Sequence, residues 1–241
     1  MKLSVISIVL CAASFVMQVE AREVEVKITE EKAYSSVLHG TEHIKIQHVQ
    51  DTNHVIEDSF AKTPRPCPPF CVNPLAIADD VETVAELELI EFMETDYSQG
   101  SGAVIDVRPP SSYQRGTIPG STNIPFTIFE KPADDAKLVE VLEGVGARER
   151  GKVGVIQRGI ESLGFFDGDM KTDQWDFTQA KALLIWCDGP WCEQSPRAIH
   201  ALVKLGYPAE KIKYYRGGLQ MWKSLGLTTV TPSDNSAVAS R

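Results

Sequence analysis

The chain has 241 residues, of which 43% are hydrophobic, and a formal net charge of -9 at pH 7. This hydrophobic content suits a globular core and argues against a largely disordered chain. The acidic charge argues against a surface for nucleic acid or anionic lipid, because both partners require clustered Lys and Arg.

Residues 1–21 have the organisation of a cleavable signal peptide. Lys2 precedes an apolar stretch from Leu3 to Val16, and small residues end at Ala21, where we expect cleavage. An uncleaved anchor is the alternative, but the apolar run is shorter than the roughly 20 residues of a spanning helix. We therefore expect an exported protein, periplasmic or secreted, that has no contact with a membrane after the signal is removed.

Residues 22–80 are predicted to form a β-rich N-terminal extension followed by a connector. Apolar and polar residues alternate over 24–28 and 44–49, which predicts two short strands with a turn near Gly40. The histidines of this extension show no ligand spacing, so we predict that they are exposed and that there is no metal site. They are His39, His43, His48 and His54.

The connector over residues 63–74 contains five prolines, which exclude a regular helix or sheet. It carries Cys67 and Cys71, and an exported protein meets an oxidising compartment. The two thiols can form a structural disulfide, act as a redox pair or bind a soft metal. The first two interpretations stay open, and no cofactor is predicted.

Residues 81–232 are predicted to form the main domain, followed by a flexible tail over 233–241. Val81 opens a predicted helix in which Leu87, Ile90 and either Phe92 or Met93 face inward. A strand over 103–108 ends at Asp106 and Arg108, for which we expect a structural ion pair. Ala136–Leu142 is a predicted helix.

Residues 165–175 are predicted to form an acidic, solvated loop. This loop directly precedes the strand that ends at Cys187. We therefore expect it to cover the mouth of the active site.

An apolar run over 183–186 ends at Cys187, a Gly189-Pro190 turn follows, and Ser195 precedes a helical pattern. This pattern predicts a strand, a tight loop and a helix. A cysteine in this position faces loop N–H groups and the positive end of the helix, which favours the thiolate. We expect an open sulfur in a bowl of main-chain amides, with Gly189 adopting the unusual backbone angles that the bowl needs.

Three motifs in this order resemble the rhodanese-like domain: Asp106-x-Arg108, the Gly116–Pro125 turn, and the Cys187 loop with Gly217-Gly218 ahead of Trp222. The resemblance implies an α/β fold with a mainly parallel sheet flanked by helices. It also implies transfer of a sulfane sulfur from a small sulfur-containing donor, through a Cys187 persulfide, to a thiol or cyanide. The connector makes the chain similar to exported bacterial members that carry a Cys-Pro-Pro-Phe-Cys segment.

The Cys187 loop differs from the family pattern in two respects. It is longer, which resembles phosphatase-like relatives, but it has no Arg before Gln194. The missing Arg argues against a phosphatase and leaves Arg197 or Arg216 as the predicted anion-binding groups. It also contains Cys192, a candidate resolving thiol. A thiol-disulfide redox or redox-sensing protein and a non-catalytic binding module are therefore the alternative functions. The other predicted loop residues are Asp188, Gly189, Pro190, Trp191, Glu193, Gln194 and Ser195.

Overall fold

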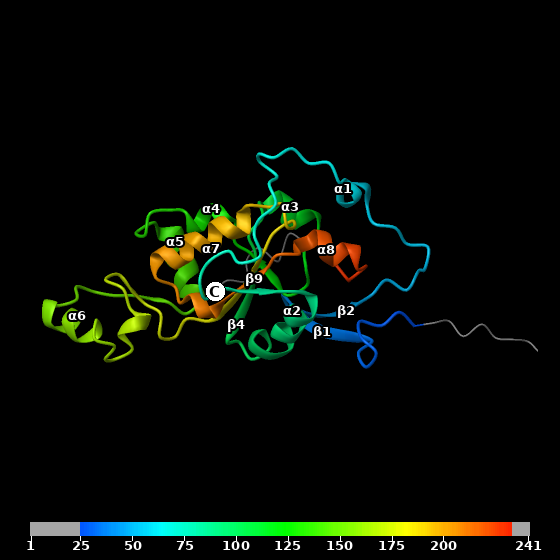
Figure 1. Cartoon of the computed structure of the whole chain (residues 1–241). Coiled ribbons are helices and arrows are strands. Elements are labelled where there is room, and N and C mark those ends of the chain that lie inside the picture. The colour runs from blue at the N-terminus through cyan, green and yellow to red at the C-terminus, as the bar shows by residue number, and fades with distance from the viewer. Residues whose placement is uncertain (1–24, 233–241) are drawn as a thin grey trace, which may run out of the picture.

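The computed structural model of the protein describes residues 25–232 (Figure 1), so the signal-peptide prediction and the predicted tail lie outside the described residues. The domain is organised around a five-stranded sheet in the order β3-β9-β8-β4-β5, and all its paired strands are parallel. The predicted α/β fold with a parallel sheet is confirmed. The strands are β1 (Tyr34–His39), β2 (Glu42–Gln47), β3 (Glu82–Val84), β4 (Gly102–Asp106), β5 (Ser121–Asn123), β6 (Arg148–Glu149), β7 (Trp175–Asp176), β8 (Ala182–Trp186) and β9 (Ile212–Tyr215).

Helices connect the parallel strands, as parallel pairing requires. No helix within residues 25–232 is long and apolar enough to cross a membrane. The helices are α1 (Asp58–Ala61), α2 (Glu86–Phe92), α3 (Pro110–Arg115), α4 (Phe126–Phe129), α5 (Ala136–Gly144), α6 (Val155–Glu161), α7 (Gln194–Leu205) and α8 (Gly218–Ser224), with short helical turns η1 (Met93–Tyr97), η2 (Gly168–Met170) and η3 (Ala209–Lys211).

The central strand β8 is buried on both faces, and successive side chains serve two different cores. Leu183 and Ile185 pack with residues of α4, α5 and α7, whereas Leu184 and Trp186 pack with residues of α2, α8 and the N-terminal hairpin. The continuous apolar run before Cys187 therefore reflects a strand covered by helices on each side. Its carboxyl end delivers Cys187 to the edge of the sheet.

The N-terminal extension is an antiparallel hairpin of β1 and β2, with Gly40 in the predicted turn at a φ of +62°. The predicted strand over 24–28 is wrong in its described part, because Val26 donates its N–H to the Gln50 side chain instead of to a strand. The first strand of the hairpin is β1. Val37 and Ile46 are buried beneath the sheet with the residues of α2 and α8, so the hairpin extends one of the two cores.

The predicted helix at Val81 begins later than expected. Residues Glu82–Val84 form β3, which pairs with β9, and α2 starts only after Ala85. Leu87 is 52% exposed, so its predicted inward position is wrong, and Leu89 is buried beside Ile90 instead. The strand explains the shift, because Thr83 and Val84 are β-branched and suit an edge position in a sheet.

The loop over residues 165–175 does not cover the active site. It leads into the amino end of β8, whereas Cys187 follows the carboxyl end of this strand. In Figure 1 the neighbouring helix α6 lies at the left edge of the molecule, away from α3 and α8. The expectation is wrong because a segment that precedes a strand reaches the opposite end of the sheet from a residue that follows it.

Candidate functional site

The site lies where β8 and β9 end, and the loop after each strand supports the other. The N–H of Leu219 donates to the carbonyl of Cys187 at 3.0 Å, and the N–H of Gln220 donates to that of Asp188 at 2.9 Å. Gly218 has a φ of +58°, and a Cβ on it would lie 2.6 Å from the Gly189 nitrogen. The second glycine of the Gly217-Gly218 pair is therefore required by the close approach of the Cys187 loop.

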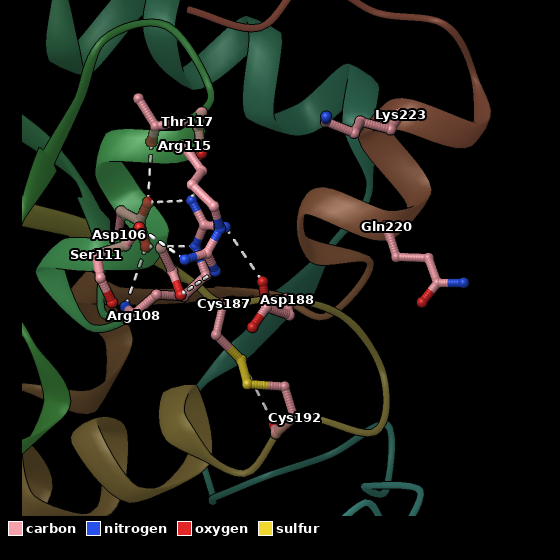
Figure 2. Close-up of polar contacts among 12 residues, drawn as sticks. Asp106, Arg108, Ser111, Arg115, Thr117, Cys187, Asp188, Cys192, Gln220 and Lys223 are labelled. Atoms are coloured by element: carbon pink, nitrogen blue, oxygen red, sulfur yellow. Dashed lines mark hydrogen bonds and ion pairs between the residues drawn. A yellow bond between two sulfur atoms is a disulfide. The ribbon is translucent and has the colours of Figure 1, made fainter. Parts of the chain in front are cut away.

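Cys187 and Cys192 form a disulfide across this loop, with Cα atoms 6.4 Å apart (Figure 2). A turn in which the Cys192 N–H donates to the Gly189 carbonyl at 2.9 Å folds the loop back on itself. The two residues are 2% and 5% exposed and pack with the α7 side of the core. The expectation of an open sulfur at Cys187 is therefore wrong for this oxidised state.

Gly189 has a role different from the one we predicted. Its φ lies outside the left-handed region that Gly218 occupies, and a Cβ on it would stand 3.2 Å from Trp191 Nε1 and 3.3 Å from Gln220 Cβ. The position therefore requires a small residue because Trp191 folds over the loop. Trp191 Nε1 donates to the Gln220 side chain at 2.8 Å.

Asp106 and Arg108 form the predicted structural ion pair, and both side chains are buried. Arg108 donates from Nε and Nη2 to the two Asp106 oxygens at 2.9 and 2.7 Å, and Thr117 donates to the same carboxylate at 2.9 Å. Arg108 Nη1 also reaches Asp188 of the Cys187 loop at 3.1 Å (Figure 2). Burial lowers the pKa of Arg108, but the hydrogen bonds and charges of the two aspartates outweigh burial and raise it above its usual value.

A cleft of about 560 Å³ opens beside the loop. Its walls include Asp188 and Trp191 of the loop and Glu57 of the N-terminal extension. The cleft combines four cationic side chains with two carboxylates. The carboxylates pair with two of the cations, Lys223 with Glu57 and Arg108 with Asp188, so the charges of the other two are available to a small anion. The cations are Arg65, Arg108, Arg115 and Lys223.

The predicted anion-binding residues Arg197 and Arg216 do not line this cleft. Arg197 donates to both Glu130 oxygens at 2.7 and 2.8 Å and also pairs with Glu193 at 3.3 Å. Arg216 donates to the Asn73 carbonyl at 2.7 Å. Sequence reasoning missed the cleft cations because they come from four separate segments, and only the fold brings these together.

The other loop residues divide into anchored and unpartnered groups. The Pro190 carbonyl accepts the N–H of Asn73 at 2.8 Å. Gln194 Oε1 and Ser195 Oγ, at the start of α7, are buried and have no hydrogen-bond partner among residues 25–232. These two atoms are polar groups available to a species bound in the loop.

The connector lies over the loop. Cys67 and Cys71 form a second disulfide, and both residues are exposed. The Phe70 ring meets Trp191 edge to face at 5.5 Å, and the Arg65 guanidinium lies 3.8 Å from the centre of the Trp191 ring. Figure 1 shows the cyan segment before β3 arching over α3 and α8. Residues 63–74 are called the strap from here on.

Metal ligands do not gather at either disulfide. Within residues 25–232 no group of three or more His, Cys, Asp or Glu side chains is placed to hold a metal ion. His39 accepts the Gly120 N–H through Nδ1 at 3.2 Å, which fixes the end of β1. The four histidines of the extension therefore do not form a shared site in the described part of the chain.

Residues 88–225, more than half of the chain, match the profile of the family described as Rhodanese-like domain. No curated protein matches the chain. Among solved structures, it is similar to the human single-domain sulfurtransferase TSTD1, at 19% identity over 59% of this chain and 96% of that one, with a TM-score of 0.33. It is also similar to a rhodanese-related protein from Thermoplasma volcanium, at 18% identity over 63% of this chain and 99% of that one, with a TM-score of 0.36. A rhodanese from E. coli is similar at 20% identity over 54% of this chain and 99% of that one, with a TM-score of 0.27.

Proposed function

The chain belongs to the rhodanese-like domain family, and from this premise we propose that it is a sulfurtransferase whose reduced Cys187 takes up a sulfane sulfur. One observation carries the proposal: Cys187 follows the central strand, directly before Asp188 of the cleft wall, and is paired with a second cysteine of the same loop. The donor is a small anion such as thiosulfate, and the acceptor is a thiol or cyanide.

The cleft provides the site for the donor. Arg65 and Arg115 line it and have no carboxylate partner among residues 25–232, so their charges are available to an anion. Lys223 and Arg108 line the same space, but Lys223 is paired with Glu57 and Arg108 with Asp106 and Asp188. These side chains take the place of the arginine that the Cys187 loop itself does not contain.

The transfer begins from the dithiol form of the loop. The Cys187 thiolate attacks the outer sulfur of thiosulfate, the S–S bond of the donor breaks, and sulfite leaves with the electron pair of that bond. The product is a Cys187 persulfide. The buried Ser195 hydroxyl has no partner among residues 25–232, so it is available to donate a hydrogen bond to a sulfur anion formed in the loop.

The persulfide then has two routes. An external thiol or cyanide takes the outer sulfur and regenerates the Cys187 thiolate. Alternatively, the Cys192 thiolate attacks Sγ of Cys187, hydrosulfide leaves, and the loop disulfide of the structure forms. On this second route a dithiol reductant must supply two electrons and two protons before the next cycle.

The same disulfide favours a second candidate, a thiol-disulfide redox protein without sulfur transfer. Both cysteines of the loop are paired with each other, as expected if disulfide formation and reduction are the whole function. In this case the cationic cleft recognises an acidic partner instead of a sulfur donor. A binding module without catalysis requires that neither cysteine of the loop reacts after reduction.

Intact-mass analysis separates these candidates. The protein is reduced with a phosphine, desalted, and treated with thiosulfate, and we expect a mass gain of one sulfur atom that maps to Cys187. In Cys192→Ser the persulfide should persist, whereas the wild type should release sulfide and return to the disulfide. If thiosulfate leaves the reduced wild type unmodified while glutathione disulfide reoxidises the loop, the redox candidate is correct.

We also infer export to the periplasm or outside the cell from residues 1–21. The two disulfides of the described chain support this inference, because disulfides persist in oxidising compartments. N-terminal sequencing of protein from fractionated cells checks it. We expect a mature chain that begins at Arg22, and a cell-associated chain that begins at Met1 would contradict it.

A further inference from the structure

The strap contacts the Cys187 loop at the residues that flank one cysteine of each disulfide. Phe70, the residue before Cys71, packs against Trp191, the residue before Cys192. Asn73, two residues after Cys71, donates its side-chain amide to the Cys192 carbonyl at 2.7 Å. The contacts on both sides of Cys71 therefore align this stretch of the strap with the Cys192 end of the loop.

Hydrogen bonds from Asn73 hold the strap against the loops that follow β8 and β9. The Asn73 N–H donates to the Pro190 carbonyl, and the Asn73 carbonyl accepts two hydrogen bonds from Arg216 at 2.7 and 3.2 Å. Arg216, which we predicted to bind an anion, therefore fixes the position of the strap instead. A strap that served only as a spacer would not need its backbone bonded to both active-site loops.

The two disulfides differ in access. Cys67 and Cys71 are exposed, together with apolar side chains beside them, including Phe70 and Val72. Cys187 and Cys192 are buried, with Trp191 and the strap above them. A protein reductant can therefore reach the first pair directly, whereas the second pair is shielded from it.

We propose that Cys67–Cys71 is a second redox site that receives electrons from a dithiol protein and passes them to Cys187–Cys192, a proposal that rests on the sulfurtransferase function above. The partner presents an exposed Cys pair and an apolar rim that fits Phe70 and Val72. It reduces Cys67–Cys71 to the dithiol and becomes a disulfide itself, a transfer of two electrons and two protons.

The internal step is a thiol-disulfide exchange. The Cys71 thiolate attacks Sγ of Cys192, the Cys187–Cys192 bond breaks, and Cys187 leaves as the thiolate that sulfur uptake needs. The Cys67 thiolate then attacks Sγ of Cys71, and Cys192 leaves as a thiolate and takes a proton. The net result is one disulfide formed in the strap and one lost from the loop, so electrons balance within the chain.

Trapping the mixed disulfide tests the internal step. In full-length Cys67→Ser/Cys187→Ser the described part of the chain keeps only Cys71 and Cys192, and we expect mild oxidation to join them, as seen by peptide mapping without reduction. The matched variant is Cys71→Ser/Cys187→Ser, which keeps Cys67 and should cross-link at least 10-fold less. Failure of Cys71 and Cys192 to cross-link, or equal cross-linking in the two variants, overturns the proposal.

Reduction kinetics test the relay as a whole. With a thioredoxin-type dithiol protein as reductant, we expect the loop disulfide of Cys67→Ser/Cys71→Ser to open at least 10-fold more slowly than that of the wild type. Thr63→Ala, at an exposed strap position outside the proposed contact with the reductant, serves as the strap control and should keep the wild-type rate. Equal rates in the cysteine variant and the wild type overturn the relay, while failure of phosphine-reduced wild type to take up sulfur overturns the sulfurtransferase function separately.

Discussion

The two disulfides of this protein occupy opposite environments. Cys67–Cys71 lies in an exposed, proline-rich strap, whereas Cys187–Cys192 is buried at the end of the central strand, against the α7 core. Exposure makes the first pair easy to reach, whereas the second pair belongs to the loop whose Asp188 and Trp191 line the cleft. The comparison shows that access and reactivity are divided between two segments and joined by contacts around Trp191.

The largest expected effect comes from removing the buried nucleophile. Cys187→Ser should reduce sulfur uptake from thiosulfate by roughly 100-fold or more, because Cys187 is the proposed nucleophile and no other described cysteine stands directly at the end of the central strand. Sulfite release by the reduced protein is the measurement. Cys192→Ser is the matched control and should keep the first uptake. Uptake that persists in Cys187→Ser would place the reactive sulfur elsewhere.

Loss of the arginine that joins the sheet to the loop should destabilise the whole domain. Arg108→Met leaves Asp106 buried without its charged partner, and breaking such a pair costs about 3–5 kcal/mol. The free energy of unfolding in urea checks this cost. Lys137→Met, which breaks the exposed pair with Glu140, should cost at most about 1 kcal/mol. Similar losses in the two variants would show that burial of Arg108 does not matter.

The difference in access should appear directly in partial reduction. With a limiting small thiol, Cys67–Cys71 should open roughly 10-fold faster than Cys187–Cys192, because exchange requires approach to a sulfur atom. Timed alkylation and peptide mapping give both rates. Trp191→Ala removes the ring that Phe70 and Arg65 cover, and it should reduce the difference between the two reduction rates. Equal rates in the wild type would erase the contrast between the two pairs.

The sequence motifs located the centre of the fold but not its margins. The runs at 103–108 and 183–187 identified β4 and β8 because both strands are covered on each face and need continuous apolar residues. The sequence analysis did not predict β3 or β1. β3 is a short edge strand that depends on its partner β9, far along the chain, and β1 belongs to a hairpin that depends on the core formed with α2 and α8.

The site divides in the same manner. Cys187, Cys192 and the Asp106–Arg108 pair were visible because each lies in a local motif. The cleft cations were not, since Arg65, Arg115 and Lys223 come from the strap, α3 and α8. The one signal for a cleft cation in the sequence was Arg65, a charged residue within the proline-rich segment. Its contact with Trp191 can be identified only in the folded structure.

An exposed cleft cation should have a smaller effect than either buried group. Arg115→Gln should raise the KM for thiosulfate roughly threefold with kcat little changed, because an exposed charge contributes up to about 1 kcal/mol. Added salt should shrink the difference between variant and wild type. Lys137→Gln, outside the cleft, is the control. A fall in kcat with an unchanged KM would mean that Arg115 acts on the chemical step instead.

The smallest expected effect is a pH dependence of folding stability that comes from His39 of the hairpin and involves neither disulfide. Burial lowers the pKa of His39 below its ordinary 6.5, against a smaller opposing effect of Glu42. The unfolded chain therefore takes up the proton first as pH falls, so this contribution is complete above about pH 6.5 and is lost progressively below it. Between pH 7 and pH 5 the Tm of the wild type should fall further than the Tm of His39→Asn. The difference between the two falls should be smaller than the roughly 2–4 °C that corresponds to 1 kcal/mol in a domain of this size. Parallel curves for the two proteins would contradict this assignment.

The connection between the strap and the sheet is short: from Asn73, which is bonded to the loop, only a few residues lead to β3 at Glu82. A tether of this length holds one group near another at an effective concentration of order millimolar. Free thiols in dilute surroundings compete poorly with such a neighbour. In the proposed relay the reduced strap is a local source of thiol, so inserting flexible residues between Asn73 and Glu82 should lower its effective concentration without altering a side chain at either disulfide.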